Sequence, residues 1–233
     1  MVPAAVAELI KDARNPVAFT GAGMSAESGL ETYRDPHSGL WENVDPTAMA
    51  SIDAWARDPE PMWAWYLWRA RCSANAEPNA GHRALADIPV ITQNIDNLHE
   101  RAGSAEVVHL HGSLFDYRCT ICSRPYRKVE LPTEPEARAT PPTCPLCGNL
   151  VRPGVVWFGE ALPSREWARA EDLISNCDLL IVVGTSGVVQ PAASLPRLAH
   201  RVLEISPQPT EFTPWVDAYW ETTAAKGLPL LFP

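Results

Sequence analysis

The sequence has no long hydrophobic run. The main candidate, residues 179–183, stops at Gly184, far short of the roughly 18 to 20 apolar residues that cross a bilayer. The N-terminal stretch has no early basic cluster, and Glu8 and Lys11 interrupt its apolar residues, unlike a secretory signal. We therefore expect a cytoplasmic protein with no membrane partner.

Basic side chains are also scarce. The chain has 19 Lys and Arg against 28 Asp and Glu, a formal charge of −9. This charge opposes general attraction to nucleic acid or anionic membranes, so no nucleic-acid partner is expected. The sequence contains no internal repeats or heptads either. It does have 233 residues, 46% of them hydrophobic, which is enough for a domain-sized core and excludes disorder as the main state.

Short apolar runs alternate with stretches of helical periodicity along the chain. The predicted strands are residues 16–20, 89–92, 107–110, 155–158, 178–184 and 201–205. The predicted helices are residues 8–13, 61–75, 82–86, 165–176 and 192–200. This alternation is typical of an α/β protein with a Rossmann-like, doubly wound parallel sheet.

Two stretches interrupt that alternation. Residues 31–62 have little strand character and predict an insertion of loop and short helix. Residues 113–153 hold four cysteines and seven prolines, and their apolar content is too low for independent folding. We therefore expect a small zinc-binding domain, 113–153, inserted into a Rossmann-like domain of residues 1–112 and 154–233.

Four of the six cysteines form two C-x-x-C pairs. The pairs are Cys119 with Cys122 and Cys144 with Cys147, and 21 residues separate them. Two such turns can converge on one tetrahedral ion, and four thiolates leave no open coordination position, so a structural zinc site is predicted. Unrelated thiols and an iron–sulfur cluster are the alternatives.

A glycine turn follows the first predicted strand. Residues 21–26 read GAGMSA, which matches the G-x-G-x-x-G/A pattern that places a pyrophosphate at a helix N-terminus. The acidic residue expected at the end of a second strand is missing, because Glu42 and Asp45 lie in the insertion. This disfavours an ordinary dehydrogenase. A structural turn that merely needs small residues is the alternative.

Polar clusters follow two further strands, at residues 92–96 and 184–186. The carboxyl ends of parallel strands face the ligand crevice, and polar groups are costly to bury without a partner. These clusters therefore indicate a ligand site, although either could simply cap a helix.

Two histidines, His109 and His111, lie two residues apart in a predicted strand and so point to the same side of it. His109 is interpreted as a satisfied core residue. His111 lies at the strand end, and an imidazole is well matched to taking a proton from a hydroxyl near neutral pH. It is the candidate general base.

Taken together, these motifs carry a resemblance. GAGMSAESGLETYR, TQNIDNLH, HLHGSLFDYRC, the two cysteine pairs, VVWFGE and VGTSGVVQPAA occur in the order and spacing of the sirtuin family. Sirtuins are NAD-dependent protein-lysine deacylases with a Rossmann-like domain and a smaller zinc domain. The resemblance implies NAD and zinc as cofactors and acylated lysine in proteins or peptides as the partner, with nicotinamide and O-acyl-ADP-ribose as products. A monomer is expected.

The resemblance also assigns residues. His111 aligns with the catalytic base, and Val156, Trp157, Phe158, Gly159 and Glu160 align with the strand that pairs with a substrate peptide. The residues aligned with cofactor contacts are Gly21, Ala22, Gly23, Glu27, Thr32, Tyr33, Arg34, Trp41, Gln93, Asn94, Ile95, Asp96, Gly184, Thr185, Ser186, Ser206 and Ala225. Tyr33 and Ser206 depart from the usual phenylalanine and asparagine.

The acyl preference is predicted from Tyr66 and Arg69, which are three residues apart in a predicted helix and share a face. A guanidinium and a phenol together suit an acyl chain that ends in a carboxylate. Tyr-x-x-Arg followed by EPNAGH resembles the class III sirtuins, which remove succinyl and malonyl groups as well as acetyl. An aromatic core helix with Arg69 at its solvent edge is the alternative.

Two other functions stay open from the sequence. An NAD-dependent ADP-ribosyl transferase shares the first chemical step, and a zinc-ribbon adaptor would bind nucleic acid or protein without catalysis. The small module has five basic and four acidic residues between Ser113 and Leu150, a balance that argues against a phosphate-binding surface.

Overall fold

The centre of the protein is a six-stranded parallel sheet in the order β3-β2-β1-β6-β7-β8. The computed structural model describes residues 1–30, 45 and 49–233, so most of the predicted insertion at residues 31–62 lies outside the described residues. The strands are β1 (Pro16–Thr20), β2 (Val90–Thr92), β3 (Val107–His109), β6 (Leu179–Val183), β7 (Val202–Ser206) and β8 (Ala218–Glu221). The predicted parallel α/β fold is confirmed.

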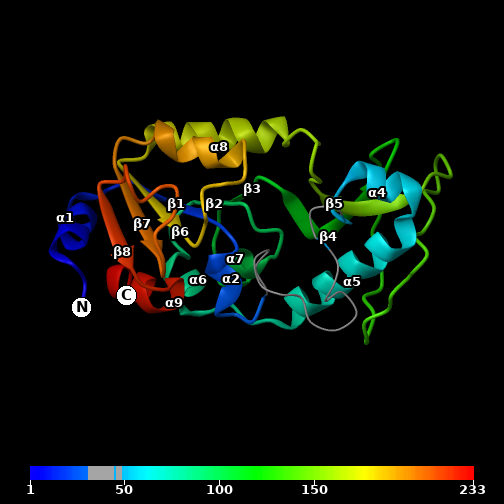
Figure 1. Ribbon diagram of the computed structural model, residues 1–233, viewed down its shortest axis with the longest axis horizontal. Coiled ribbons are helices and arrows are strands. Elements are labelled where there is room, and N and C mark those ends of the chain that lie inside the picture. Colours follow the sequence, from blue (N-terminus) through cyan, green and yellow to red (C-terminus); the bar gives the residue numbers. More distant parts are fainter. Residues whose placement is uncertain (31–44, 46–48) are drawn as a thin grey trace.

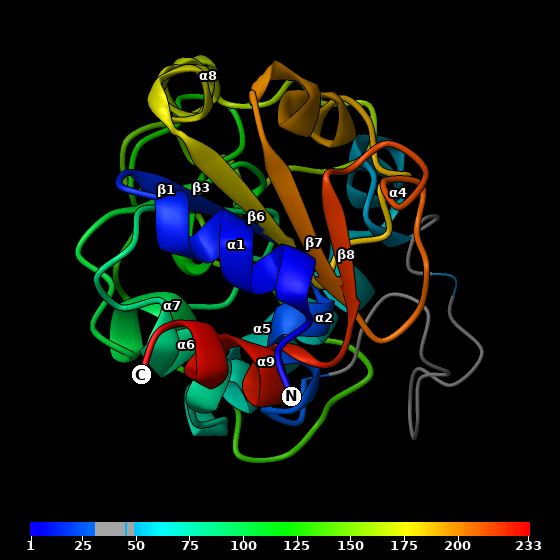
Figure 2. The ribbon, with the colours of Figure 1, turned by 90° about the vertical axis from the view of Figure 1, so that its left-hand side faces the viewer.

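Helices cover both faces of this sheet, as Figure 2 shows. On one face lie α8 (Ser164–Asn176) and the 3₁₀ helix η2 (Ala192–Leu198), and on the other lie α1 (Ala4–Asp12), α2 (Gly23–Ala26), α6 (Ala80–Ala84) and α9 (Ala224–Leu231). The short α7 (Leu98–Arg101) follows β2. Every residue of β6 is buried, because a parallel strand between two helical layers has no solvent face.

A smaller lobe lies at one end of the elongated molecule (Figure 1). It contains α4 (Ile52–Arg57), α5 (Pro59–Asn75) and an antiparallel pair, β4 (Gly112–Cys119) with β5 (Val151–Val155). Aromatic residues of α5, such as Trp63 and Tyr66, share one hydrophobic cluster with Leu114 and Val151 of the two strands. The cysteine-bearing strands therefore obtain much of their core from α5.

Some element predictions were wrong. Residues 155–158 were predicted as a strand, but β5 spans Val151–Val155 and includes Pro153 and Gly154, which weakened the strand pattern. Residues 192–200 were predicted as a helix, but the helix is of the 3₁₀ type, contains Pro196 and ends at Leu198. The sequence reading missed β4 and β8, and it missed α9 because Gly227 and Pro229 interrupt its helical pattern.

Candidate functional site

The loops after β1, β2 and β6 meet at the carboxyl edge of the sheet. The chain runs outward from β1 through β2 to β3, and from β6 through β7 to β8 in the other direction, so a ligand crevice is expected between β1 and β6. The backbone N–H of Gly23 donates to the carbonyl of Gly184 at 2.8 Å. Gln93 Nε2 donates to Thr185 Oγ1 at 2.9 Å. Three separate loops are thus joined in one site.

The contact between the loops after β1 and β6 requires glycine at position 184. The φ of Gly184 is +61°, and a Cβ built on it would lie 2.5 Å from the carbonyl carbon of Gly23. A side chain at either position would push the two loops apart, since real Cβ contacts are not that short. The glycine pattern is therefore used for close packing between loops as well as for the turn itself.

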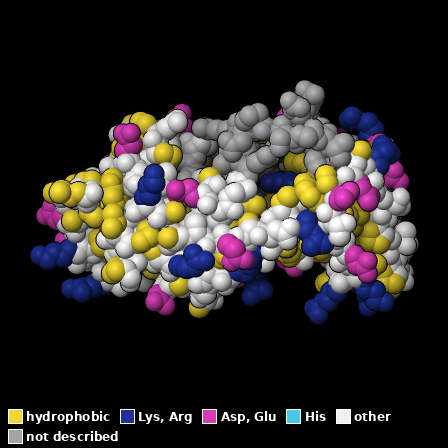
Figure 3. Space-filling model, turned by 90° about the horizontal axis from the view of Figure 1, so that it is seen from below, with side chains coloured by type: hydrophobic (Ala, Val, Ile, Leu, Met, Phe, Trp, Pro, Cys, Tyr) yellow, Lys and Arg dark blue, Asp and Glu magenta, His cyan; other side chains and the backbone are white. Residues whose placement is uncertain are grey.

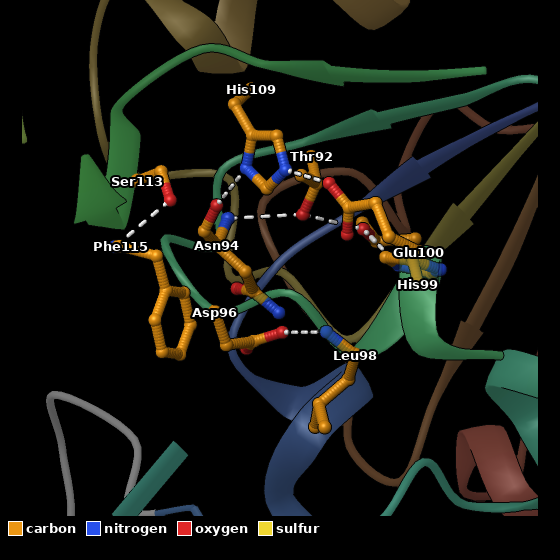
Figure 4. Close-up of polar contacts among 10 residues, drawn as sticks. Thr92, Asn94, Asp96, Leu98, His99, Glu100, His109, Ser113 and Phe115 are labelled. Carbon is orange, nitrogen blue, oxygen red and sulfur yellow. Dashed lines mark hydrogen bonds and ion pairs between the residues drawn. The ribbon is translucent and has the colours of Figure 1, made fainter. Parts of the chain in front are cut away.

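A buried polar network lies beneath these loops. Ser25 Oγ donates to Asp96 Oδ2 at 2.9 Å, and Asn94 Nδ2 donates to Ser25 Oγ at 3.2 Å. The backbone N–H of Leu98 donates to the other carboxylate oxygen of Asp96 at 3.0 Å (Figure 4). Burial raises the pKa of Asp96, although both hydrogen bonds act to lower it. These contacts fix the side chains of Asn94 and Asp96 at the strand edge.

Several members of this network were missed by the sequence reading. Ser25 Oγ lies 3.4 Å from His82 Nε2, and Thr20 Oγ1 lies 3.1 Å from His99 Nε2. Burial lowers the pKa of His82 to about 4 and that of His99 well below its usual value, so both rings are neutral. Asn79 donates to the carbonyl of Met24 at 2.9 Å. Residues 79–82, which read NAGH, were quoted only as part of the family resemblance. They contain Asn79 and His82 and were therefore the sequence signal that could have revealed these members of the network.

His111 is oriented as a general base. Its Nδ1 lies 3.0 Å from the carbonyl oxygen of Gln93. A carbonyl only accepts, so Nδ1 carries the proton and Nε2 keeps its lone pair. Burial lowers the pKa of His111 below its ordinary 6.5, and the hydrogen bond to Gln93 opposes this only in part. The ring is therefore neutral at neutral pH, with Nε2 available to accept a proton.

The four predicted metal ligands come together in the smaller lobe. The Sγ atoms of Cys119, Cys122, Cys144 and Cys147 all lie within 4.8 Å of one another. The Sγ atoms of Cys119 and Cys147 are 3.4 Å apart, and those of Cys122 and Cys144 are 3.7 Å apart. A tetrahedron with Zn–S bonds of roughly 2.3 Å has edges of roughly 3.8 Å, so the four thiolates fit zinc.

The family model for the Sir2 family matches residues 21–191. The chain belongs to the Sir2 family. It is 61% identical over 95% of its length to "NAD-dependent protein deacylase 2" of Corynebacterium efficiens, covering 92% of that protein. It is also 48% identical over 91% of its length to the NAD-dependent protein deacylase of Mycobacterium tuberculosis H37Rv, covering 93% of that protein.

Solved Sir2 structures agree with the fold. One is a Sir2 homologue in complex with NAD, which has a TM-score of 0.91 and 42% identity and matches 100% of this chain and 93% of its own. Another is a complex of Sir2 with a p53 peptide and NAD⁺, which has a TM-score of 0.84 and 32% identity and matches 99% of this chain and 97% of its own. The predicted family and fold class are confirmed, and the relatives' names agree with the predicted enzyme class and with NAD as cofactor.

In this Sir2-family chain, the predicted peptide segment 156–160 leads out of the core beside His111. The backbone N–H of Val156 donates to the carbonyl of His111 at 2.9 Å. Glu160 binds the buried Arg152 through both carboxylate oxygens, at 2.5 and 2.8 Å, and accepts the N–H of Trp157 at 2.8 Å. The Arg152 guanidinium lies 3.3 Å from the Trp157 ring centroid. These contacts shape the segment from inside and leave Phe158 45% exposed.

Tyr66 and Arg69 share a face of α5, as their spacing predicts. Tyr66 is buried, and its ring centroid lies 6.4 Å from that of Trp157 in the peptide segment. The Arg69 guanidinium lies 4.7 Å from the Trp65 ring centroid and 5.9 Å from that of Tyr66. The guanidinium is thus held among aromatic rings. Its proposed role in reading a carboxylate stays a prediction.

The other predicted cofactor positions occupy the same edge of the sheet or lie outside the described residues. Glu27 accepts the backbone N–H of Ala225 at 3.1 Å, so two of these positions contact each other. Ser206 Oγ donates to the carbonyl of Gln208 at 2.7 Å, which turns its hydroxyl into its own loop. Ile95 packs against the smaller lobe. Thr32, Tyr33, Arg34 and Trp41 lie outside the described residues.

The surface of this Sir2-family chain carries mixed charge. Figure 3 shows basic and acidic side chains interspersed on the face seen from below. None of the helices in the described ranges combines the length and apolar character needed to cross a membrane.

Proposed function

We propose that this chain removes acyl groups, including succinyl, malonyl and acetyl, from lysine side chains in proteins or peptides, with nicotinamide and O-acyl-ADP-ribose as products. The observation that carries the proposal is His111, with Nδ1 held by the Gln93 carbonyl and Nε2 unprotonated. Membership of the Sir2 family and the names of its relatives support the enzyme class.

When bound, NAD would supply a ribose carbon from which nicotinamide leaves and to which the acyl oxygen bonds. The remaining ADP-ribose would be the acceptor of the acyl group. The residues proposed to hold NAD are those of the three loops, because their glycines allow close backbone approach. Gln93, Asn94 and Asp96, which the family resemblance aligns with the nicotinamide ribose, present polar atoms at the strand edge. His111 Nε2 takes the proton from a ribose hydroxyl, which the depressed pKa of the ring permits at neutral pH.

The peptide is proposed to bind in an extended form along residues 156–160. Glu160, Arg152 and Trp157 order this segment from inside. The N–H groups of Val156 and Phe158 already donate to the carbonyls of His111 and Ala50, so the strand pairing is proposed for the remaining outward backbone groups. Strand pairing fixes the lysine and asks little of the flanking sequence. This mode is consistent with a protein that acts on many acylated lysines.

The preference for acidic acyl groups is proposed from Arg69 and Tyr66. The neighbouring rings of Trp65 and Tyr66 contact the guanidinium of Arg69, and a guanidinium binds a carboxylate through two parallel hydrogen bonds. We therefore predict that Arg69→Met lowers kcat/KM for a succinyl-lysine peptide by roughly 100-fold, from the loss of about 2 to 3 kcal/mol of charged hydrogen bonding. Deacetylation by the same variant is expected to change by only a few fold.

Mass spectrometry of products from NAD and matched succinyl, malonyl and acetyl peptides measures both effects. Arg57→Met, at an exposed arginine of the neighbouring α4, is the control for the loss of one positive charge. Equal losses on succinyl and acetyl peptides in Arg69→Met would refute the acyl assignment. ADP-ribose attached to protein in place of free acyl-ADP-ribose would identify an ADP-ribosyl transferase, and no release of nicotinamide would identify a non-catalytic adaptor.

A further inference from the structure

His109 lies two residues before the proposed base and contacts the same loop. Its neighbours Val108 and Leu110 pack in the hydrophobic cluster that contains α8, so His109 points to the opposite side of β3. Its Nδ1 lies 2.9 Å from the carbonyl oxygen of Asn94, and its Nε2 lies 2.7 Å from Glu100 Oε1. Figure 4 shows the ring between these two acceptors. The prediction that His109 is a satisfied histidine is confirmed. The identity of its two partners also determines its protonation state.

The two partners of His109 determine its protonation. A backbone carbonyl accepts only, and an ionised carboxylate accepts only. A neutral imidazole has one N–H and can satisfy one of them, so both contacts together require the imidazolium. Burial alone would lower the pKa of His109, but the Glu100 carboxylate raises it above the ordinary 6.5. Burial would raise the pKa of Glu100, and the hydrogen bond from His109 lowers it instead.

The charged groups that act on His109 lie on one side of the sheet. Glu100 on α7 and Asp96 in the loop after β2 both favour the cation. His99, also on α7, is neutral because burial holds its pKa well below 6.5. The helix on the other face, α8, shares a hydrophobic cluster with Val108 and Leu110. The cation is therefore balanced by carboxylates on its own side of the sheet.

The end of β3 and the turn that follows it thus present two rings with opposite protonation to successive carbonyls. His111 contacts the Gln93 carbonyl as a neutral ring, and His109 contacts the Asn94 carbonyl as a cation. These carbonyls belong to the loop whose side chains, Gln93, Asn94 and Asp96, are proposed to hold the nicotinamide ribose. Movement of either carbonyl would displace those side chains.

We propose that protonated His109, paired with Glu100, is a positioning residue that holds loop 93–96 in the conformation that binds the nicotinamide end of NAD. Loss of the His109 proton breaks one of its two contacts and loosens the loop. The effect is fully present below pH 6.5 and is lost as the pH rises through the higher pKa of the folded state. Activity then falls on the alkaline side because of His109, whereas it rises on the acidic side because of His111. The inference rests on the proposed function.

The protonation state is tested without turnover by ¹⁵N NMR of the histidine rings in the metal-loaded protein. The chain has six histidines, so single His→Gln variants assign the signals. At pH 6.5 His109 is expected to be mostly protonated on both nitrogens and His111 mostly on Nδ1 only. A His109 that is mostly neutral at pH 6.5 would overturn the proposal. Glu100→Gln is expected to move the His109 titration to lower pH, and an unchanged titration would contradict the pairing.

The positioning role is tested by the pH profile of labelled-nicotinamide exchange with an acyl peptide. Exchange is measured in a His111→Ala background, so that the base does not contribute a titration. His109→Gln is expected to lower kcat/KM for NAD about tenfold below pH 6.5, the size of one charged hydrogen bond, and to abolish the alkaline fall. Glu100→Gln, which keeps the imidazole, is expected to move that fall to lower pH.

The outcomes separate this inference from the proposed function. If His109→Gln and Glu100→Gln exchange nicotinamide with the parent pH profile, the positioning role is refuted while the deacylase assignment stands. If the wild-type chain exchanges no nicotinamide at any pH, the proposed function fails first. If His109→Gln does not fold, Glu100→Gln and the NMR titration still decide the question.

Discussion

At the scale of single residues, the site depends on which acceptor each imidazole faces. His82 and His99 are neutral because they are buried among neutral hydroxyl groups and each other. His109 faces a carboxylate and is charged, and His111 faces one carbonyl and keeps an unprotonated Nε2. Of these four histidines, His109 is charged and the other three are neutral, because their partners differ.

His111→Ala is expected to lower deacylation by at least roughly 10² to 10⁴-fold, the usual contribution of a general base. NAD affinity and folding are expected to be nearly unchanged, because the hydrogen bond from the neutral His111 ring to the Gln93 carbonyl is weaker than the charged one that His109 donates to the Asn94 carbonyl. Product formation, NAD titration and circular dichroism measure the three quantities. Wild-type turnover in this variant would remove His111 from the mechanism.

The rise of activity with pH on the acidic side of the profile is also assigned to His111. The pKa of His111 is below 6.5 because the ring is buried, so kcat/KM is expected to rise with pH through a midpoint below 6.5. A profile of kcat/KM between pH 4.5 and 8 measures this. A midpoint above 6.5 would show that a group other than a buried neutral histidine controls the step.

At the scale of elements, segment 156–160 owes its shape to one buried ion pair. Arg152 is 2% exposed and Glu160 is 23% exposed, and the carboxylate also caps the N–H of Trp157. Breaking such a pair leaves a buried charge without its partner. The pair therefore orders a segment that lies beyond the end of β5 and has only an isolated bridge at Phe158.

Glu160→Gln is therefore expected to destabilise folding by about 3 kcal/mol and to raise KM for peptide more than KM for NAD. Burial favours the protonated acid, but the hydrogen bonds from Arg152 and Trp157 lower the pKa of Glu160 below 4.5. Its stabilisation is thus present above pH 4.5 and is lost as the pH falls through the lower folded-state value.

Urea unfolding at pH 7 and at pH 3.5 measures the difference between wild type and variant. Glu171→Gln, on the exposed side of α8, is the matched control and is expected to change stability by less than about 0.5 kcal/mol. A Glu160→Gln variant as stable as this control would contradict the role of the pair.

At the scale of the whole molecule, the two lobes obtain their cores differently. Two hydrophobic clusters lie on the two faces of the parallel sheet. The third cluster joins α5 to β4 and β5, and the four cysteines close the far end of those strands. The metal therefore stabilises the lobe that carries α5 and the segment 156–160. The domain boundaries at residues 113 and 153 stay a prediction.

Cys144→Ser is expected to release the zinc and to lower the melting temperature by several degrees, because structural zinc couples to folding. Metal content by elemental analysis and thermal unfolding measure the two effects. Cys72→Ser, outside the cysteine cluster, is the control and is expected to retain one zinc per chain. A metal-free wild-type chain of undiminished stability would contradict the structural role.

The sequence predicted the strands that are continuous apolar runs, because burial on both faces leaves a strong local pattern. Residues 16–20 form β1 as predicted, and 179–183 form β6 within the predicted range. The pattern failed at β5, where Pro153 and Gly154 are tolerated only through pairing with β4. It failed at α9 for the same reason, since contacts with α6 stabilise a helix that contains glycine and proline.

By itself, the sequence determined the family, the parallel fold and the four cysteines of the metal site, because each of these follows from the order and spacing of residues along the chain. Only the tertiary structure decided which groups face His109 and His111, how the glycine turn packs against Gly184, and how Arg152 holds Glu160. Those contacts join segments from different strands and helices. The protonation and hydrogen bonding of these side chains follow from burial and from neighbours distant in the sequence, which no local pattern specifies.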